Sequence, residues 1–444
     1  MPDDPIAPHP SGTLSRAATV ARRRRWAIAW LLGLGVLINY FDRVNLSVSR
    51  DALMAQFHIT DVVFGYLLGA YNWTYCLCQL PIGVVLDRLG VRRIGRISTF
   101  VWSMASFAAA ATPNIPGFFG ARFLLGVGEA PTFPANAKAI GLWFPKHERS
   151  FSTALFDSAA KMGPAIGVPL IGLLLLRAGW RWSFAATGVV SFLYFLLFFA
   201  MYRDPEEDPQ IGPEELAIIR AERGAAPAGP EPKASLGDLL RQRKVLGLAI
   251  GFGSYNYVFY LLLNWLPSYI SISLHIDLMH SFLYTGVPWL VATAAELLIG
   301  GLLVDRLVQR GWNESRTRMT VLVGGTAMGL GILGCAGAHS AVHAIAWVSL
   351  SIGGLSAASP VGWSLPSLIA PRASVGRVGG ILNFSNQISG IAAPIITGYL
   401  VYARHAFGLA FGIAGAYIVV GICAYLFLLR DTHPMSVGRL EKSV

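Results

Sequence analysis

The stretch from Gly120 to Gly141 is apolar and long enough to cross a lipid bilayer, yet it carries Arg122, Glu129 and Lys138. A charge placed at the depth of the hydrocarbon costs about 2.5–3.5 kcal/mol on insertion scales. Arg122 and Glu129 are two helical turns apart, so they share one helix face, about 10 Å apart along the axis. That face must be turned toward protein or water. A guanidinium there can bind an anion, and a carboxyl group there can bind a proton.

A second charged pair, Asp42 and Arg43, lies near the end of another apolar stretch. Adjacent residues on a helix point about 100° apart, so these two side chains do not neutralise each other and each requires another partner. Arg122 and Glu129 are the available partners. An arginine holds a carboxylate bidentately and stays charged, whereas a carboxyl group shielded from water can load and release a proton. We therefore expect Arg43 to bind an anion and Asp42 and Glu129 to carry protons.

Other charged residues inside apolar stretches allow two interpretations. Asp157 and Lys161 have the i,i+4 spacing that lets them meet on one helix face, either as a structural pair or as part of a binding pocket. Lys138 lies near the end of its helix and can extend its ammonium to the membrane surface. Glu296 is deep in its stretch without an obvious partner. The sequence leaves open whether Glu296 is structural or functional.

Long apolar runs recur along the whole chain. Of its 444 residues, 54% are apolar and 13% are charged, and that charged share is about half of what a soluble domain carries. Stretches of spanning length, twelve in all, lie at 26–46, 60–82, 94–112, 114–141, 151–176, 181–202, 244–270, 281–304, 319–338, 343–369, 378–403 and 405–430. We predict an all-α integral membrane protein with 12 transmembrane helices in two six-helix bundles.

Basic residues set the expected orientation. The net charge of +11 does not indicate nucleic-acid binding, because Lys and Arg gather in short segments between apolar runs, as topology signals do. When the N-terminus is placed inside and the spans alternate, nearly all Lys and Arg between the spans fall on the inside. We therefore expect both termini in the cytoplasm, a multi-pass location in the cell inner membrane, and no nucleic-acid partner.

One long hydrophilic segment divides the chain. Within it, Gly212-Pro213-Glu214-Glu215 predicts the start of a short polar helix, with proline at the first helical position and acids in the first turn. The expected divisions are a cytoplasmic N-terminal tail, an N-terminal six-helix bundle, a cytoplasmic linker, a C-terminal six-helix bundle and a cytoplasmic C-terminal tail, at residues 1–25, 26–202, 203–243, 244–430 and 431–444.

An internal repeat supports this division. The pattern Gly-x3-Asp-Arg follows the second stretch and recurs after the eighth, at matching places in each half. Glycine permits close helix approach, the aspartate can cap a neighbouring helix, and the arginine can pair with a carboxylate across the interface. We expect the charged members of the repeat to act in gating between the halves; they are Asp87, Arg88, Asp305 and Arg306.

The repeat and the six-plus-six layout resemble the major facilitator superfamily. The first copy matches the family's loop signature in full and the second in part. A narrower resemblance, to the anion:cation symporter family of bacterial galactonate, glucarate and hexuronate transporters, rests on three segments, Asn39–Asn45, Gly126–Pro134 and Trp143–Arg149. This narrower resemblance is strong in the N-terminal half and weaker in the C-terminal half.

The resemblance implies roles for individual residues. Acids at the positions of Asp42 and Glu129 take part in proton coupling, and Arg122 links them to the binding site. The anion is contacted by residues at the positions of Tyr40, Arg43 and Tyr75, and the pocket is closed from the other half by Trp363 and Asn383. Asn386 is a further candidate for bonding hydroxyl groups. The chain departs from its relatives near Ala160, where an amide is common, so Lys161 is a candidate anion-binding residue of its own.

These observations predict a proton-coupled symporter for a small organic anion, a sugar acid such as an aldonate, aldarate or hexuronate, that acts as a monomer by alternating access. Alternatives are an aromatic-acid or dicarboxylate symporter, with Lys161 as a second anion clamp, and an anion sensor that moves nothing. An enzyme is not expected, because no nucleophile–base pair is found. The four cysteines form no CxxC pair and no Cys/His ligand spacing, so neither a metal nor a cofactor is implied.

Overall fold

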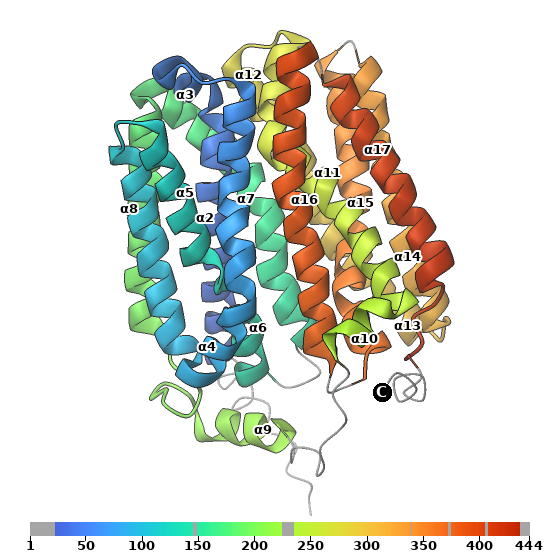
Figure 1. Cartoon of the computed structure of the whole chain (residues 1–444). Coiled ribbons are helices and arrows are strands. Elements are labelled where there is room, and N and C mark those ends of the chain that lie inside the picture. Colours follow the sequence, from blue (N-terminus) through green and yellow to red (C-terminus); the bar gives the residue numbers. More distant parts are fainter. Residues whose placement is uncertain are drawn as a thin grey trace, which may run out of the picture.

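The computed structural model describes residues 23–144, 149–223, 235–338, 340–371, 374–404 and 407–435, and helices account for most of them (Figure 1). In chain order these are α2 (Arg23–Val48), α3 (Arg50–Phe57), α4 (Asp61–Ala111), α5 (Ile115–Glu129), α6 (Thr132–Trp143), α7 (Arg149–Ala178), α8 (Trp180–Met201), α9 (Pro213–Arg223), α10 (Leu236–Arg241), α11 (Arg243–Leu274), α12 (Leu278–Ala295), the π-helix η2 (Glu296–Leu303), α13 (Val304–Gln309), α14 (Glu314–Met328), the 3₁₀-helix η3 (Gly329–Gly337), α15 (Ala341–Ile369), α16 (Val375–Arg404), α17 (Gly408–Cys423) and the π-helix η5 (Ala424–Leu429).

Each apolar stretch marked in the sequence is helical, but two boundaries differ from expectation. The second and third stretches are not separated by an open loop. They form the two arms of α4, and the chain reverses at Gly90, where φ is 76°. Only glycine adopts this backbone conformation without steric cost. The fourth stretch is divided into α5 and α6 around Ala130 and Pro131, since proline cannot continue the hydrogen bonding of the preceding helix.

The helical arm that carries the Gly-x3-Asp-Arg pattern ends at a different distance from the pattern in each copy of the repeat. In the first copy the reversal at Gly90 comes seven residues after Gly83. In the second copy the helix continues through η2 and α13, and the next left-handed glycine is Gly311, with φ of 87°, ten residues after Gly301. Residue 308, which corresponds to Gly90, is a valine. The second arm is therefore longer by three residues, about 4.5 Å of helix.

Among the described residues, eight helices are long and apolar enough to cross a membrane, and nine if the bent pair α3 and α4 is taken as one span. The remaining marked stretches fail this test for visible reasons. α5 is only 15 residues long and contains Arg122 and Glu129. α16 carries the polar side chains Asn383, Asn386 and Gln387. Candidate site residues lie on these polar helices and also on helices that pass the test, such as Arg43 on α2 and Lys161 on α7.

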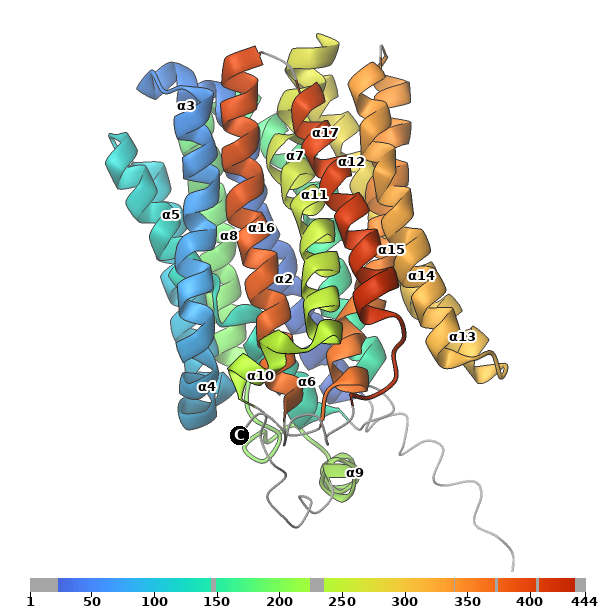
Figure 2. The ribbon, with the colours of Figure 1, turned by 45° about the vertical axis from the view of Figure 1, so that its right-hand side comes forward.

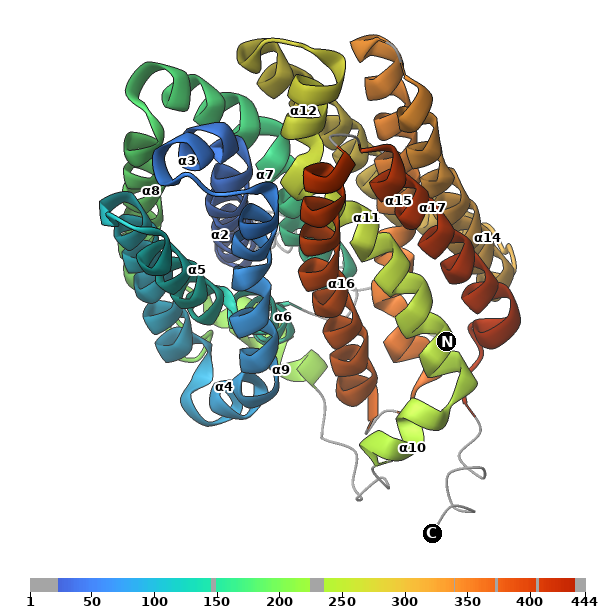
Figure 3. The ribbon, with the colours of Figure 1, turned by 45° about the horizontal axis from the view of Figure 1, so that its top comes forward.

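We call helices α2 to α8 the N-terminal half and helices α11 to α17 the C-terminal half. They meet along two seams, α4 against α16 and α7 against α12 (Figures 1–3). The end of the molecule that bears α3 is here the α3 end, and the opposite end is the α9 end. Near the α3 end the backbones approach closely: a Cβ atom added to Gly65 would lie 2.7 Å from the carbonyl oxygen of Pro394, and one added to Gly286 would lie 2.7 Å from that of Ala165.

Both seams end near the middle of the helices with a polar contact. On α4–α16 the amide of Asn383 donates to Gln79 Oε1 at 3.0 Å. On the α7–α12 side, an ion pair joins Lys161 of α7 to Glu296, the first residue of η2. Farther toward the α9 end, a Cβ atom added to Gly83 or to Gly380 would have no described heavy atom of another segment within 4 Å. The halves are therefore closed together at the α3 end and apart at the α9 end.

The close approach at Gly65 allows a direct test of the seam. We expect Gly65→Val to force α4 and α16 apart at the α3 end, because the clash is with backbone and costs about 1–3 kcal/mol. The hydroxyl groups of Tyr66 and Tyr399 face each other across this seam at 3.2 Å. Disulfide formation between cysteines placed at these two positions should become slower. The matched control, Gly83→Val on the same helix, meets open space and should leave the rate unchanged; equal slowing in both would contradict the assignment.

The segment between the halves packs under the N-terminal half. α9 begins at Pro213, as predicted. Ahead of it, Asp208 accepts two hydrogen bonds from Arg24, at 2.7 and 2.9 Å, and Glu215 lies 3.7 Å from Arg25. These contacts fix the linker to the start of α2, at the α9 end (Figure 2).

Candidate anion- and proton-binding site

Arg43, on α2, and Glu129, at the end of α5, form a buried ion pair in the N-terminal half. Arg43 Nε donates to Glu129 Oε2 at 3.0 Å, and the two side chains are 6% and 0% exposed. The pairing expected from the sequence is present. Among the described residues, Arg43 Nη2 and Glu129 Oε1 are buried without a hydrogen-bond partner. Because buried polar atoms are nearly always satisfied, these two atoms indicate where a further polar group can bind.

Three tyrosine rings surround the Arg43 guanidinium. Its carbon atom lies 4.5 Å from the ring centre of Tyr40, 4.7 Å from that of Tyr71 and 5.6 Å from that of Tyr75. Tyr40 and Tyr75 were expected from the sequence, whereas Tyr71 was missed. The i,i+4 spacing of Tyr71 and Tyr75 on α4 is the signal that could have found it. Rings around a guanidinium hold it in one orientation and stabilise its charge.

Asp42 does not pair with Arg122 through side chains, so that part of the expectation is wrong. Its carboxylate accepts hydrogen bonds from Ser106 at 2.7 Å and from Ser191 at 2.8 Å, and it is 1% exposed. Arg122 instead donates to the main-chain oxygen of Asp42 at 3.3 Å. The reason is geometric: the Asp42 side chain points toward α4 and α8, whereas Arg122 approaches α2 from α5.

Lys161 lies between two carboxylates. Its ammonium is 3.2 Å from Asp157 Oδ2, on the same helix, and 3.0 Å from Glu296 Oε2, at the start of η2 in the other half. The i,i+4 pair expected from the sequence is therefore present. Glu296, for which the sequence offered no partner, has Lys161 as its partner.

The candidates in the C-terminal half are placed differently from one another. Asn383 reaches Gln79 of the N-terminal half, so it lies where the seam ends. Asn386 accepts a hydrogen bond from Asn256 at 2.7 Å, within its own half. Trp363 is 40% exposed and packs edge-on against Phe252, with ring centres 5.2 Å apart. Of the three, only Asn383 contacts the other half through a hydrogen bond between described residues.

The charged residues of the repeat lie at the α9 end. Arg88, Asp305 and Arg306 are exposed, and no ion pair joins them to one another across the halves among the described side chains. Their role in gating between the halves stays a prediction. The side chain of Asp87 lies outside the described part.

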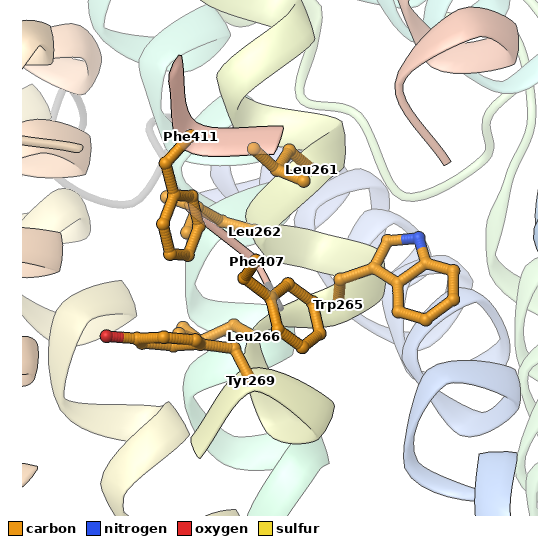
Figure 4. Close-up of a pocket in the computed structure, with 7 residues that line it drawn as sticks. All are labelled: Leu261, Leu262, Trp265, Leu266, Tyr269, Phe407 and Phe411. Atoms are coloured by element: carbon orange, nitrogen blue, oxygen red, sulfur yellow. The ribbon is translucent and has the colours of Figure 1, made fainter. Parts of the chain in front are cut away.

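A small pocket on the C-terminal half is unsuited to an anion. Figure 4 shows its lining side chains, which come from α11 and from the start of α17 with the residue before it. It is lined by Leu261, Leu262, Trp265, Leu266, Tyr269, Phe407 and Phe411. None of these side chains carries a charge, so the pocket offers nothing to compensate a carboxylate.

Comparisons with known proteins agree with this architecture. The sequence pattern of the Major Facilitator Superfamily matches residues 32–394. The chain is 37% identical over 410 residues to the transporter YybO of Bacillus subtilis, covering 92% of this chain and 94% of that protein. It is 31% identical over 417 residues to a D-galactonate transporter of Escherichia coli, covering 92% and 96%. It is 30% identical over 432 residues to the probable galactarate/D-glucarate transporter GarP of Escherichia coli, covering 94% and 97%.

The fold is that of solved transporters. The inward-open structure of the xylose transporter XylE from E. coli superposes with a TM-score of 0.75 at 15% identity, covering 94% of this chain and 99% of that one. A bacterial homolog of the human lysosomal transporter Spinster, inward-facing, gives 0.69 at 16% identity, covering 92% and 98%. The resemblance expected from the sequence is confirmed: this chain belongs to the Major Facilitator Superfamily, as a multi-pass membrane transporter homologous to sugar-acid transporters.

Proposed function

We propose that this protein is a secondary active transporter that carries a sugar acid, such as an aldonate, aldarate or hexuronate, together with protons across the cytoplasmic membrane. The observation that carries the proposal is the buried Arg43–Glu129 pair, in which each partner keeps one polar atom unsatisfied among the described residues. The relatives that transport galactonate and galactarate support the choice of anion.

In this mechanism the substrate carboxylate and Glu129 compete for Arg43. While Glu129 is ionised, the guanidinium is neutralised and a second carboxylate next to it would leave a buried negative charge in excess, which costs several kcal/mol. A proton on Glu129 removes that excess. Arg43 then binds the substrate carboxylate bidentately, held in place by its tyrosine rings. Loss of the proton restores the ion pair and expels the anion, so binding of the two ligands is coupled.

Alternating access follows from the two seams. We place the α9 end in the cytoplasm, with twelve crossings and both termini inside, so that the conformation described is open inward. The opposite state requires the α4–α16 and α7–α12 seams to separate at the α3 end while the α9 ends meet. Asn383 and Gln79 lie where the seam ends and supply amides for substrate hydroxyl groups, with Tyr75, Asn386 and Trp363 as further lining candidates.

Flux in proteoliposomes tests the proposal. With the purified protein as a monomer in the membrane, a proton gradient directed into the vesicles should drive accumulation of galactonate or galactarate above its external concentration. An uncoupler, which dissipates the proton gradient, should abolish this accumulation. Accumulation that does not depend on the pH gradient would refute the proposed proton coupling. Binding without flux would identify an anion sensor.

A second prediction concerns the role of Asp42 in proton coupling, for which we expect a smaller effect. We expect Asp42→Asn to keep the fold, since an amide oxygen can still accept from Ser106 or Ser191, and to lower pH-driven uptake about tenfold through loss of one proton-binding group. Uptake at several external pH values measures this, with Ser191→Ala as the control that removes one hydrogen bond and keeps the carboxylate. An unchanged pH profile in Asp42→Asn would show that Asp42 is structural.

A further inference from the structure

The strongest feature that the Arg43 site does not use is the group formed by Asp157, Lys161 and Glu296. It joins α7 of the N-terminal half to η2 of the C-terminal half. The side chains of Lys161 and Glu296 are 4% and 1% exposed, and that of Asp157 is 16% exposed. The group is thus a buried charged contact between the two halves.

The charges of this group do not balance. One ammonium faces two carboxylates, so with all three ionised the group carries one negative charge in excess. Lys161 donates to Glu296 Oε1 at 3.1 Å, whereas Oε2, although 3.0 Å away, has no hydrogen-bond partner among the described residues. An uncompensated buried charge costs several kcal/mol, so the group can accept the carboxylate of a ligand only if one of its own carboxyl groups takes up a proton. The titratable groups that face Lys161 from the other packed helices are the phenols of Tyr40 on α2 and Tyr255 on α11, and neither supplies a positive charge.

Glu296 is the carboxyl group that can leave. Asp157 is four residues from Lys161 on one helix, so it stays beside the ammonium in every conformation of the halves. Glu296 comes from the other half and is separated from Lys161 when the halves move. It is also the first residue of a π-helix, a geometry that occurs mostly at functional sites.

Tyr40 lies near both buried cations. Tyr40 packs on the Arg43 guanidinium at 4.5 Å, and the same tyrosine faces Lys161. A Cβ atom added to Gly163, two residues from Lys161, would lie only 2.4 Å from Tyr40 Cβ. Each cation is neutralised by a buried glutamate, Glu129 for Arg43 and Glu296 for Lys161.

We propose that Lys161 is a second carboxylate-binding group, specific for the far carboxylate of a dicarboxylate sugar acid, and that Glu296 occupies it until Glu296 takes up a proton. The inference rests on the proposed function, with Arg43 binding the first carboxylate. The far carboxylate replaces Glu296 on Lys161, and the proton on Glu296 keeps the charge of the group unchanged. A dicarboxylate therefore binds with one more proton than a monocarboxylate of the same length.

Galactarate and galactonate form a matched pair of probes, because they differ only in having a carboxylate or a hydroxymethyl group at the sixth carbon. Calorimetric titration of the purified full chain in two buffers of different ionisation enthalpy gives the protons taken up per ligand. We expect about one more proton with galactarate than with galactonate. In Glu296→Gln this difference should vanish. In Asp157→Asn, which removes the carboxylate that does not bridge the halves, it should persist.

The double variant Lys161→Gln/Glu296→Gln keeps a hydrogen bond across the seam without charges. Its galactarate affinity should fall at least about tenfold more than its galactonate affinity, the equivalent of about 1.4 kcal/mol. Two results with the unmodified protein would overturn the inference: equal proton uptake for both ligands, or failure to bind galactarate. Two results with the variants would do so as well: equal losses of affinity for the two ligands in the double variant, or disappearance of the extra proton in Asp157→Asn. Uptake of galactonate driven by a pH gradient is measured separately, so failure of the proposed function is distinguishable.

Discussion

Glu129→Gln is expected to abolish accumulation driven by a pH gradient while sparing exchange of substrate across the membrane. Glutamine has nearly the shape of glutamate and can still accept a hydrogen bond from Arg43, but it carries no charge and binds no proton. Arg43 is then permanently available to the substrate carboxylate. Substrate binding should become independent of pH, and the carrier should equilibrate its substrate instead of concentrating it. Uptake and counterflow in proteoliposomes measure the two activities side by side.

Two controls accompany this variant. Glu129→Asp keeps the proton-binding group with one methylene fewer, and should retain part of the coupled uptake. Removing one partner of a buried ion pair is costly, about 3–5 kcal/mol, so a melting curve must show that the glutamine variant is folded. A folded Glu129→Gln protein that still concentrates substrate against its gradient would refute the coupling role of Glu129.

Arg43→Lys is expected to cause the largest loss of binding, about 100-fold in affinity, although it preserves the positive charge. Lysine presents a point charge and cannot make the paired hydrogen bonds by which a guanidinium holds a carboxylate. It also stacks less well among Tyr40, Tyr71 and Tyr75. Calorimetric titration with galactonate measures the change, and proton-driven uptake should fall with it.

The matched control for Arg43→Lys is Lys138→Arg. Lys138, on α6, is another cation of the stretch from Gly120 to Gly141, but it donates to the main-chain oxygen of Leu86 on the first arm of α4, at 2.9 Å. Affinity should change little. Comparable losses in both variants would mean that any change of a buried cation disturbs the fold, and the assignment of Arg43 would fail.

Local sequence patterns predicted the helices and the contact between Arg43 and Glu129. Apolar length marked the helical stretches, and the charge of Arg43 inside one of them demanded a buried partner, which is Glu129. The spacing of Asp157 and Lys161 was enough to predict their contact. These features depend on neighbours along one helix or on the high cost of an unpaired charge in hydrocarbon, and both are readable from residue types.

Contacts between distant helices were beyond the sequence. Glu296 is 135 residues from Lys161, and Asn383 is 304 residues from Gln79. Which side chains meet there depends on how the two halves pack, and many packings bury the same apolar faces. For the same reason Asp42 found two serines instead of Arg122: serine hydroxyls at helix crossings carry no signal that separates them from ordinary packing residues.

The unequal arms of the repeat have a consequence for the opposite conformation. The opposite conformation of a transporter with two pseudosymmetric halves is often constructed by exchanging the conformations of the two halves. Here the reversal at Gly90 and the later one at Gly311 are out of register by three residues, so such a construction would misplace α13 by nearly one turn. In the opposite conformation that we propose, the two α9 ends therefore meet asymmetrically, with a longer arm from the C-terminal half against a shorter arm from the N-terminal half.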